Sequence, residues 1–396
     1  MMSPLFLTVL IIELLAGAEI DLFIPSFPDL QRVFNLSPFM VQLTISANFI
    51  PYCIGSLFAG TLGDRFNRRH VMLGSLIIFV IGSIICAFAA NFPMLLLGRF
   101  LQGLGMSGPA ILSFVVIADQ YPLEKQPAML GLLNGITSLA MSIAPVIGSY
   151  VNLYFNWRAN FVVLLTIGIL ALIAGTFYIP HKHGDSSISL SLKAYKPLIT
   201  SKKLMTFVIG ICLTAVPYWT FIGMAPILYM EGMNVELKYF GFYQGTLAGA
   251  FSLISLLSAK LSNWFGLRNC LYYSILLYIF STLALGFITA LNVQDPLIIT
   301  GVVTIYSIAV VFPINILYPI SLEVVVNSKA RSAALINCVR LLSTAAMLQL
   351  ISYVYAGNFI PLGIAMFFMS AFSLLFVWKI FQKGWAHIEV QEQISA

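Results

Sequence analysis

The chain has 396 residues, of which 60% are hydrophobic and only 9% are charged, and its formal net charge is +6. A soluble domain carries about 25% charged residues, and a soluble protein of this size needs that charge to keep its surface in water. The composition therefore argues against a soluble enzyme, a secreted domain, a disordered protein or a nucleic-acid binder, and it indicates a polytopic membrane protein.

Twelve segments are apolar enough and long enough to cross a membrane, since a helical span needs about 20 residues. The predicted spans are residues 5–25, 41–62, 71–90, 95–118, 128–151, 159–179, 204–228, 239–259, 271–291, 297–318, 333–356 and 360–380. Of the 20 Lys and Arg residues, fifteen fall on the side that would hold both termini. By the positive-inside rule, both termini are predicted to be cytoplasmic.

The first span carries three of the fourteen acidic residues, namely Glu13, Glu19 and Asp21. An ionisable side chain inside hydrocarbon costs at least about 2.5 kcal/mol, so it indicates a function. Glu13 and Asp21 lie about 80° apart around a helix, so both can border one cavity as proton-coupling residues. Glu19 points away from Glu13 and is expected at the level of the lipid headgroups. A structural pair between Glu13 and Arg99, or a water-exposed position, is the alternative for Glu13.

The turn after the second span reads GTLGDRFNRR and is both charged and rich in glycine. We predict that its residues form a conformational latch that breaks and re-forms salt bridges, with the glycines allowing close helix packing. The latch residues are Gly60, Asp64, Arg65, Arg68 and Arg69. Simple anchoring by positive charge at the membrane surface is the alternative.

The fourth span contains Arg99 in the sequence GRFLQGLG, with Gln102 one turn further along the same face. Because arginine stays charged even when buried, Arg99 is a candidate for a fixed positive charge that interacts with a titrating carboxylate. A structural ion pair is the alternative. Gln102 is a candidate for the wall of the substrate cavity.

The fifth span carries Asn134, a further candidate for the cavity, and the sequence Ala144-Pro145 followed by Gly148. Pro145 removes a backbone hydrogen bond and favours a kink. The small residues at 140, 144 and 148 recur every four positions and predict one stripe for helix packing.

The longest polar stretch, residues 180–203, follows six spans and precedes six more. It predicts an N-terminal bundle over 1–179, a cytoplasmic linker over 180–203 and a C-terminal bundle over 204–396. A degenerate repeat supports this division, because residues 259–268, AKLSNWFGLR, follow the eighth span as residues 60–69 follow the second. Two related halves around a central cavity are typical of transporters.

The second half offers polar and aromatic candidates but few charges. The predicted cavity residues there are Tyr218, Trp219, Gln244, Asn315 and Asn337. An aromatic, weakly polar wall suits lipophilic ligands. Arg340 in the eleventh span is expected to extend to the cytoplasmic face, with a substrate contact as the alternative.

Several chemistries are not indicated. The four histidines fall outside the spans, so no metal site is expected within the membrane. The chain has no GxxxxGK[ST] motif for ATP and no GxSxG or HExxH motif for hydrolysis, so we expect neither a cofactor nor an enzyme.

These features resemble the major facilitator superfamily over essentially the whole chain. Residues 60–69 are similar to its loop signature after the second span, with Asn67 in place of a glycine; asparagine tolerates left-handed backbone geometry. Arg99 with Gln102 resembles the fourth-span signature that the family associates with proton coupling. Ala144-Pro145 with Gly148 resembles the antiporter motif of the fifth span, although Ala144 stands where glycine is usual.

Two further segments resemble twelve-span drug:proton antiporters of the bicyclomycin/chloramphenicol-resistance type: IDLFIPSFP at 20–28 and Asn156-Trp157-Arg158. The resemblance implies an all-α fold of two six-helix bundles around a central cavity. It also implies proton-coupled efflux of drugs or other small lipophilic molecules across a bacterial cytoplasmic membrane by alternating access. The expected partners are a small-molecule substrate, protons and the lipid bilayer, with the proton gradient as energy source, no nucleic acid and a monomeric state.

Two alternatives stay open. The chain could export or import one defined metabolite, such as a siderophore, an amino acid or a sugar derivative. It could also be a receptor or scaffold that keeps the fold without transport, although such a protein would have no need of titratable groups in its first span.

Overall fold

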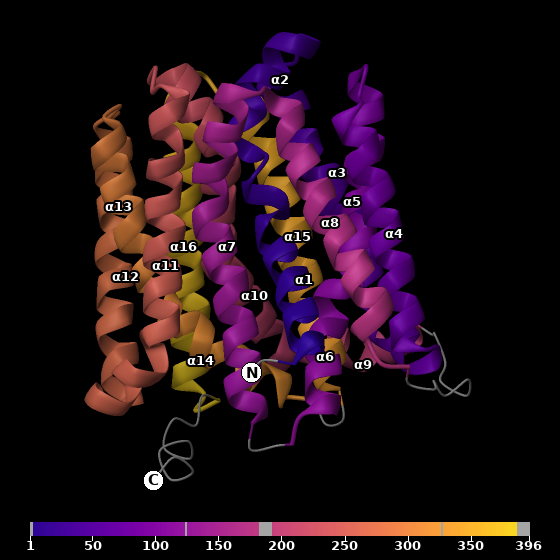
Figure 1. The fold of residues 1–396 in the computed structure, drawn as a ribbon. Coiled ribbons are helices and arrows are strands. Elements are labelled where there is room, and N and C mark those ends of the chain that lie inside the picture. The colour runs from indigo at the N-terminus through magenta and orange to yellow at the C-terminus, as the bar shows by residue number, and fades with distance from the viewer. Residues whose placement is uncertain (1–2, 123–124, 182–191, 326–327, 386–396) are drawn as a thin grey trace. The chain divides into compact units, whose positions relative to one another are not determined.

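The computed structural model describes residues 3–122, 125–181, 192–325 and 328–385, and these residues form helices joined by short connections (Figure 1). They belong to two compact units. The first comprises Met1–Ser191 together with Val235–Gly245, and the second comprises Leu192–Asn234 together with Thr246–Ala396. Of the predicted linker, residues 182–191 lie outside the described residues.

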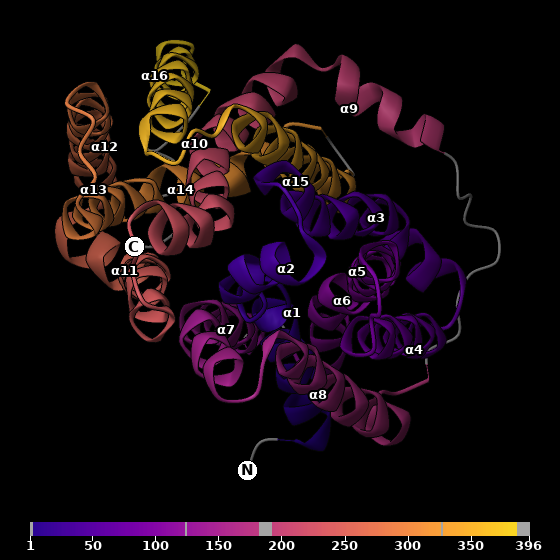
Figure 2. The same ribbon diagram turned by 90° about the horizontal axis from the view of Figure 1, so that it is seen from above.

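In the first unit, α1 packs against α7 and α8, and α5 packs against α3 and α4 (Figure 2). The helices are α1 Pro4–Asp21, the 3-10 turn η1 Ile24–Ser26, α2 Phe27–Phe34, α3 Pro38–Arg65, α4 Arg68–Ala87, α5 Phe92–Ser107, α6 Pro109–Gln120, α7 Gln126–Tyr154 and α8 Trp157–Tyr178. The start of α11, up to Gly245, also belongs to this unit.

In the second unit, α10 packs against α15 and α16, and α12 packs against α13 and α16. The helices are the 3-10 turn η2 Leu192–Tyr195, α9 Lys196–Thr200, α10 Lys202–Pro226, the π-helical turn η3 Ile227–Gly232, α11 Leu237–Phe265, α12 Leu267–Ala290, α13 Pro296–Ala309, α14 Val311–Leu322, α15 Lys329–Val354 and α16 Ile360–Gln382.

Side-chain caps determine where several helices begin. Ser3 accepts a hydrogen bond from the Phe6 amide at 3.2 Å and starts α1. Asn91 accepts one from the Met94 amide at 2.9 Å and starts α5. Such caps satisfy amide groups that have no partner inside the helix. The connections can therefore be short, and each long apolar segment begins at a defined residue.

Eleven helical segments of the described residues are long and apolar enough to cross a membrane. The remaining predicted span, residues 5–25, is α1, which has 18 residues and differs from the eleven by its three carboxyl groups. The fourth and tenth predicted spans are each divided into two helices, at Gly108 and Val310. Pro109 follows the first break directly and can donate no backbone hydrogen bond.

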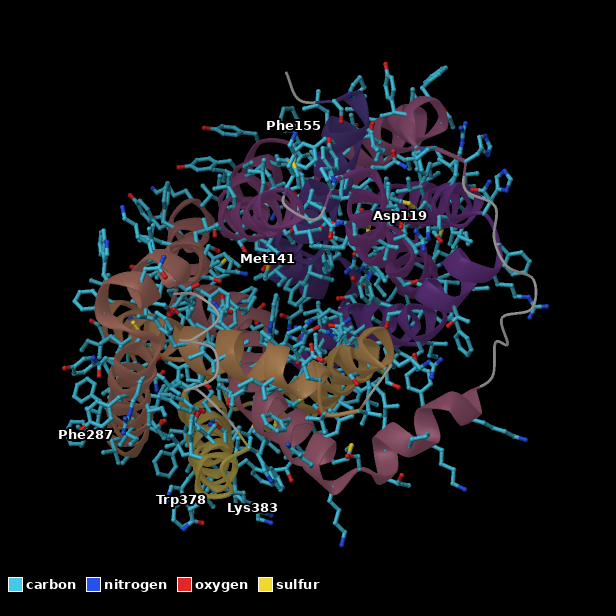
Figure 3. All side chains as sticks on the ribbon, turned by 90° about the horizontal axis from the view of Figure 1, so that it is seen from below. Asp119, Met141, Phe155, Phe287, Trp378 and Lys383 are labelled. Carbon is cyan, nitrogen blue, oxygen red and sulfur yellow. The ribbon has the colours of Figure 1, made fainter. Side chains whose placement is uncertain are left out.

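Large apolar side chains are exposed on the outside of both units. In the second unit, Phe287 is 67% exposed and Trp378 is 61% exposed, and Figure 3 shows both pointing outward. In the first unit, Phe155 is 70% exposed. Exposed apolar surface on this scale is unfavourable in water but favourable in lipid, as expected for a membrane protein.

Candidate functional site

Helix α1 brings three carboxyl groups into the interior of the first unit. Glu13, Glu19 and Asp21 are only 2%, 2% and 4% exposed. Each meets a different helix, because the three residues point in different directions around α1. Their environments therefore need to be described one at a time.

Glu13 lies between α1, α6 and α7. The Thr137 hydroxyl of α7 donates a hydrogen bond of 2.8 Å to Glu13 Oε2. Ser113 of α6 faces the same carboxyl group, yet Glu13 Oε1 and Ser113 Oγ have no hydrogen-bond partner among the described residues. One turn earlier, α1 enters a fully apolar cluster with Val9 and Leu133. Glu13 is thus held by the neutral hydroxyl of Thr137 at the edge of an apolar core.

Arg99 is completely buried on α5. Its Nε donates to the Thr44 carbonyl at 3.4 Å, and its Nη1 donates to Gln102 Oε1 at 2.7 Å. Gln102 in turn donates to Ser83 Oγ at 2.9 Å. The guanidinium carbon lies 5.0 Å from the centre of the Phe23 ring, within the range of a cation–π contact. This arrangement fixes the charge of Arg99 inside the unit and makes Gln102 its hydrogen-bond acceptor.

Glu19 belongs to the surroundings of Arg99, so its expected place at the lipid headgroups is wrong. Asn48 of α3 donates a hydrogen bond of 2.5 Å to Glu19 Oε1 and another of 3.3 Å to the Arg99 carbonyl. Glu19 and Arg99 also interact electrostatically. The direction of Glu19 on the helix was predicted correctly. The error arose because other helices enclose α1 on that side too, which periodicity within α1 cannot reveal.

Asp21, at the end of α1, accepts a hydrogen bond of 3.2 Å from Nε2 of Gln244. Gln244 lies in the part of α11 that belongs to the first unit and is 1% exposed. A proton-coupling candidate and a cavity candidate are therefore in direct contact. Asn134, by contrast, is exposed and donates to the Leu130 carbonyl of its own helix at 3.1 Å. It does not join the buried carboxyl groups.

The arginines of the turn between α3 and α4 join the ends of other helices. Arg68 forms a salt bridge with Asp119, the next-to-last residue of α6, which is labelled in Figure 3. Arg69 donates to the carbonyls of Thr176 and Ile179 at the end of α8. Arg65 lies 5.7 Å from the ring centre of Phe66. The side chain of Asp64 lies outside the described residues.

Two expectations about this turn need correction. No atom among the described residues would lie within 4 Å of a Cβ at Gly60, so the proposed close packing there is wrong, whereas a Cβ at Gly63 would meet Leu112. Asn67 is not left-handed, since its φ is −72°. Its side chain accepts a hydrogen bond of 3.0 Å from the Arg69 amide and caps α4. Asparagine thus serves here as an N-cap rather than as a substitute for glycine flexibility.

A charge swap tests the salt bridge of this turn. We expect Arg68→Glu and Asp119→Arg each to slow transport about tenfold, which corresponds to about 1.4 kcal/mol, because each places like charges together at a partly buried position. The double variant restores opposite charges and should recover much of the rate. The initial rate of transport into vesicles measures both effects, and a double variant as slow as the slower single one would refute the pairing.

The motif of the fifth span lies on α7, between α1 and the start of α11. A Cβ at Gly148 would overlap the backbone carbonyl of Leu22, just past the end of α1, and Ala144 is 3% exposed. On α11, a Cβ at Gly241 would come within 2.8 Å of the Pro145 carbonyl. The predicted packing stripe thus faces α1, while the backbone at Pro145 faces α11.

Glycines of α7 provide a matched pair of variants. Gly148→Ala should lower the stability by about 1–3 kcal/mol because the new methyl group overlaps backbone atoms that cannot move aside. Gly131→Ala, where nothing lies within 4 Å, should be neutral or stabilise the helix by about 0.5–1 kcal/mol. Thermal unfolding in detergent measures the difference. Equal melting temperatures would show that α1 and α7 can separate freely at Gly148.

Arg340 of the second unit contacts an amide and an aromatic ring. Its Nη2 donates to Asn337 Oδ1 at 2.7 Å, and its guanidinium carbon lies 5.3 Å from the ring centre of Trp219. The Trp219 ring meets Tyr218 edge to face at 5.7 Å. Because Trp219 lies in the second half of α10, Arg340 does not extend to the end of the bundle where α10 and α15 begin, and that expectation is wrong. Asn315 lies elsewhere and contacts Ser255 and Ser258 of α11.

The comparison with protein families decides the assignment. The model of the Major Facilitator Superfamily matches residues 9–348. The chain belongs to the major facilitator superfamily. This confirms the predicted all-α transporter fold and the expectation that the chain is not an enzyme.

Curated relatives and solved structures of other proteins are also similar to this chain. It is 27% identical over 255 residues to multidrug resistance protein MdtL of Escherichia fergusonii, an alignment covering 64% of this chain and 65% of that one. It is 28% identical over 259 residues to MdtL of Escherichia coli O17:K52:H18, with the same coverage. The alignment thus spans about two thirds of the length of these relatives.

The structure of a D-xylose-proton symporter shares the fold, with a TM-score of 0.75 and 15% identity over 95% of this chain and 97% of that one. A bacterial homologue of the human lysosomal transporter Spinster gives a TM-score of 0.69 and 17% identity, covering 96% of each chain.

Three residues of these contacts were not predicted from the sequence, and a fourth was given the wrong environment. Asn48, Thr137 and Asp119 are the partners of Glu19, Glu13 and Arg68, and Glu19 itself was misplaced. A signal existed for Asn48, a lone amide in the middle of an apolar span. A signal also existed for Asp119, an acid at a span end next to a basic turn. The hydroxyl of Thr137 gave none, because threonine is common in spans.

Proposed function

We propose that this facilitator exports drugs or other small lipophilic molecules across the bacterial cytoplasmic membrane in exchange for protons, by alternating access. It does so as a monomer with both termini in the cytoplasm, and the proton gradient takes the place of a cofactor. The family membership supports transport. The multidrug resistance relatives support the substrate class.

The observation that carries proton coupling is the neutral surroundings of two buried carboxyl groups. Glu13 is held by the Thr137 hydroxyl and Asp21 by the Gln244 amide. Among the described residues, neither forms a salt bridge. A carboxyl group held in this way can gain or lose a proton without breaking an ion pair. A charge left in hydrocarbon is costly, so its neutralisation can drive a structural change.

These contacts support the following transport cycle. A proton from outside binds Glu13 or Asp21, the lipophilic substrate leaves toward the outside, and the proton is released inside after the two units move. Arg99 keeps its charge throughout and adjusts how readily the acids take up protons. The Arg68–Asp119 salt bridge stabilises the outward-open state. Gly148, tightly packed on α1, transmits motion between α1 and α7.

The second unit contributes the wall that the substrate contacts. Tyr218 and Trp219 present aromatic rings, and Tyr218 also stacks on Phe251 at 5.8 Å. Aromatic surfaces favour planar lipophilic molecules through area burial and ring contacts. This wall supports drug-like substrates over a strongly hydrated metabolite.

Efflux from vesicles with an imposed pH gradient tests the proposal. Purified protein is reconstituted, loaded with a fluorescent lipophilic compound and exposed to a gradient, with protein-free vesicles and a protonophore as controls. We expect efflux that needs both the protein and the gradient. If the same assay detects transport of only a siderophore, an amino acid or a sugar derivative, the protein is a metabolite transporter and the proposed drug efflux is wrong. Binding without any transport would favour a receptor or scaffold.

A further inference from the structure

The cluster of Glu19, Asn48 and Arg99 has a different composition from the surroundings of the other two acids. Glu19 and Asn48 are 2% and 1% exposed, and Arg99 is fully buried. Among the three carboxyl groups of α1, Glu19 is the one whose environment includes the charge of Arg99. Close helix packing holds the cluster together, because a Cβ at Gly103 of α5 would come within 2.8 Å of the Asn48 backbone.

We propose that Glu19 is a third proton-binding residue of this transporter, which exchanges its proton next to the fixed charge of Arg99 and is positioned by Asn48. The proposal rests on the proposed proton coupling and assigns part of it to a residue outside the Glu13 and Asp21 pair. Asn48 is a positioning residue, since it acts through the carboxyl group that it binds.

Asn48 can serve both protonation states of Glu19. As the structure shows it, Nδ2 donates to Glu19 Oε1 at 2.5 Å, which suits a carboxylate that accepts hydrogen bonds. A protonated carboxyl group instead donates through its O–H, and it needs an acceptor. Asn48 Oδ1 is buried and has no hydrogen-bond partner among the described residues, so turning the amide over presents that acceptor.

Arg99 offers the complementary donor. Its Nε and Nη1 are engaged by Thr44 and Gln102, but its Nη2 is buried and has no partner among the described residues. An unsatisfied guanidinium donor in a dry interior is unfavourable. Nη2 is therefore a donor that could serve a carboxylate at Glu19, with which Arg99 already interacts electrostatically. The unpaired donor of Arg99 therefore favours the carboxylate form of Glu19, and the unpaired acceptor of Asn48 favours its protonated form.

The proton balance is simple. Glu19 carboxylate takes one proton from water on the outer side to become a carboxylic acid, and it returns that proton to water on the inner side. Arg99 remains charged in both states. Among the described residues, the titratable groups that interact with Glu19 are Arg99 from α5 and Cys86 from α4, while Asn48 from α3 is neutral.

Infrared difference spectroscopy of the purified protein tests this inference without requiring transport. The spectra record the carboxyl C=O band as the pH is changed. We expect Glu19→Gln to remove one pH-dependent component that Glu13→Gln and Asp21→Asn leave in place. Glu236→Gln is the matched control, because it makes the same chemical change at an exposed ion pair with Lys238 and should leave the Glu19 component in place. A Glu19→Gln spectrum identical to that of the unaltered protein would overturn the proposal.

Asn48→Ala provides a second test, which also serves if Glu19→Gln fails to fold. It keeps every carboxyl group but removes the Nδ2 donor that Glu19 Oε1 accepts from and the Oδ1 acceptor proposed for its protonated form. We expect the pH midpoint of one carboxyl component to shift, and an unshifted midpoint would contradict the role of Asn48 and Glu19. If vesicles show no proton-driven efflux while this component is present, the proposed function fails and the proton site stands. If vesicles show proton-driven efflux while this component is absent, the proposed function stands and the proton site at Glu19 fails.

Discussion

Vesicles that contain the Glu13→Gln, Asp21→Asn double variant should show no more gradient-driven efflux than vesicles without protein. Both substitutions keep the shape of the side chain and its hydrogen bonds to Thr137 and Gln244 while removing the titratable group. Without these groups only the proton position proposed at Glu19 remains, and by itself it does not couple proton movement to the substrate. Exchange of labelled for unlabelled substrate across the membrane, which needs no proton movement, should survive because the buried contacts remain.

The single variants and a matched control complete this test. Glu13→Gln and Asp21→Asn alone show which carboxyl group carries more of the coupling, and Glu236→Gln removes an exposed carboxylate by the same chemical change. The control should transport as the unaltered protein does. Efflux that stays fully dependent on the gradient in the double variant would sink the role of both acids, and Glu19 would then be the remaining carboxyl group of α1.

Hydropathy and charge in the sequence predicted the helices well, because an apolar segment of about 20 residues has few alternatives to a helix in lipid. The side-chain caps of Ser3 and Asn91 at helix starts were not among the predictions, which located the spans by hydropathy alone. The breaks at Gly108 and Val310 were not predicted. Both lie inside continuously apolar segments, where hydropathy is the same on either side of the break.

The sequence predicted which residues belong to the candidate site, but it did not predict which residues they contact. Glu13, Asp21 and Arg99 stood out because ionisable residues are rare in spans. Their partners come from helices far away in sequence: Thr137 is 124 residues from Glu13, and Gln244 is 223 residues from Asp21. No periodicity within one helix carries that information. For the same reason Glu19 was assigned to the wrong environment and Gly60 to a contact that it does not make.

The charges of Glu19 and Arg99 should prove interdependent in a double-mutant cycle. Glu19→Gln leaves the arginine charge buried without its acid, and Arg99→Gln leaves the carboxylate without its cation. Removing one partner of a buried charge pair destabilises a protein by about 3–5 kcal/mol, because the remaining charge is uncompensated. The double variant contains neither charge, and two glutamines can hydrogen-bond to Asn48 and Gln102.

We therefore expect the double variant to be more stable than the sum of the single effects predicts, with a coupling energy of about 0.5–3 kcal/mol. Denaturant unfolding in detergent measures the four proteins, and a cycle of Arg99→Gln with Glu236→Gln provides the control, since pairs without shared partners add. Additive effects of Glu19→Gln and Arg99→Gln would mean that the two groups do not sense each other. In that case the electrostatic link on which a proton at Glu19 depends would be absent, and Asn48 alone would explain why a carboxyl group is tolerated at this position.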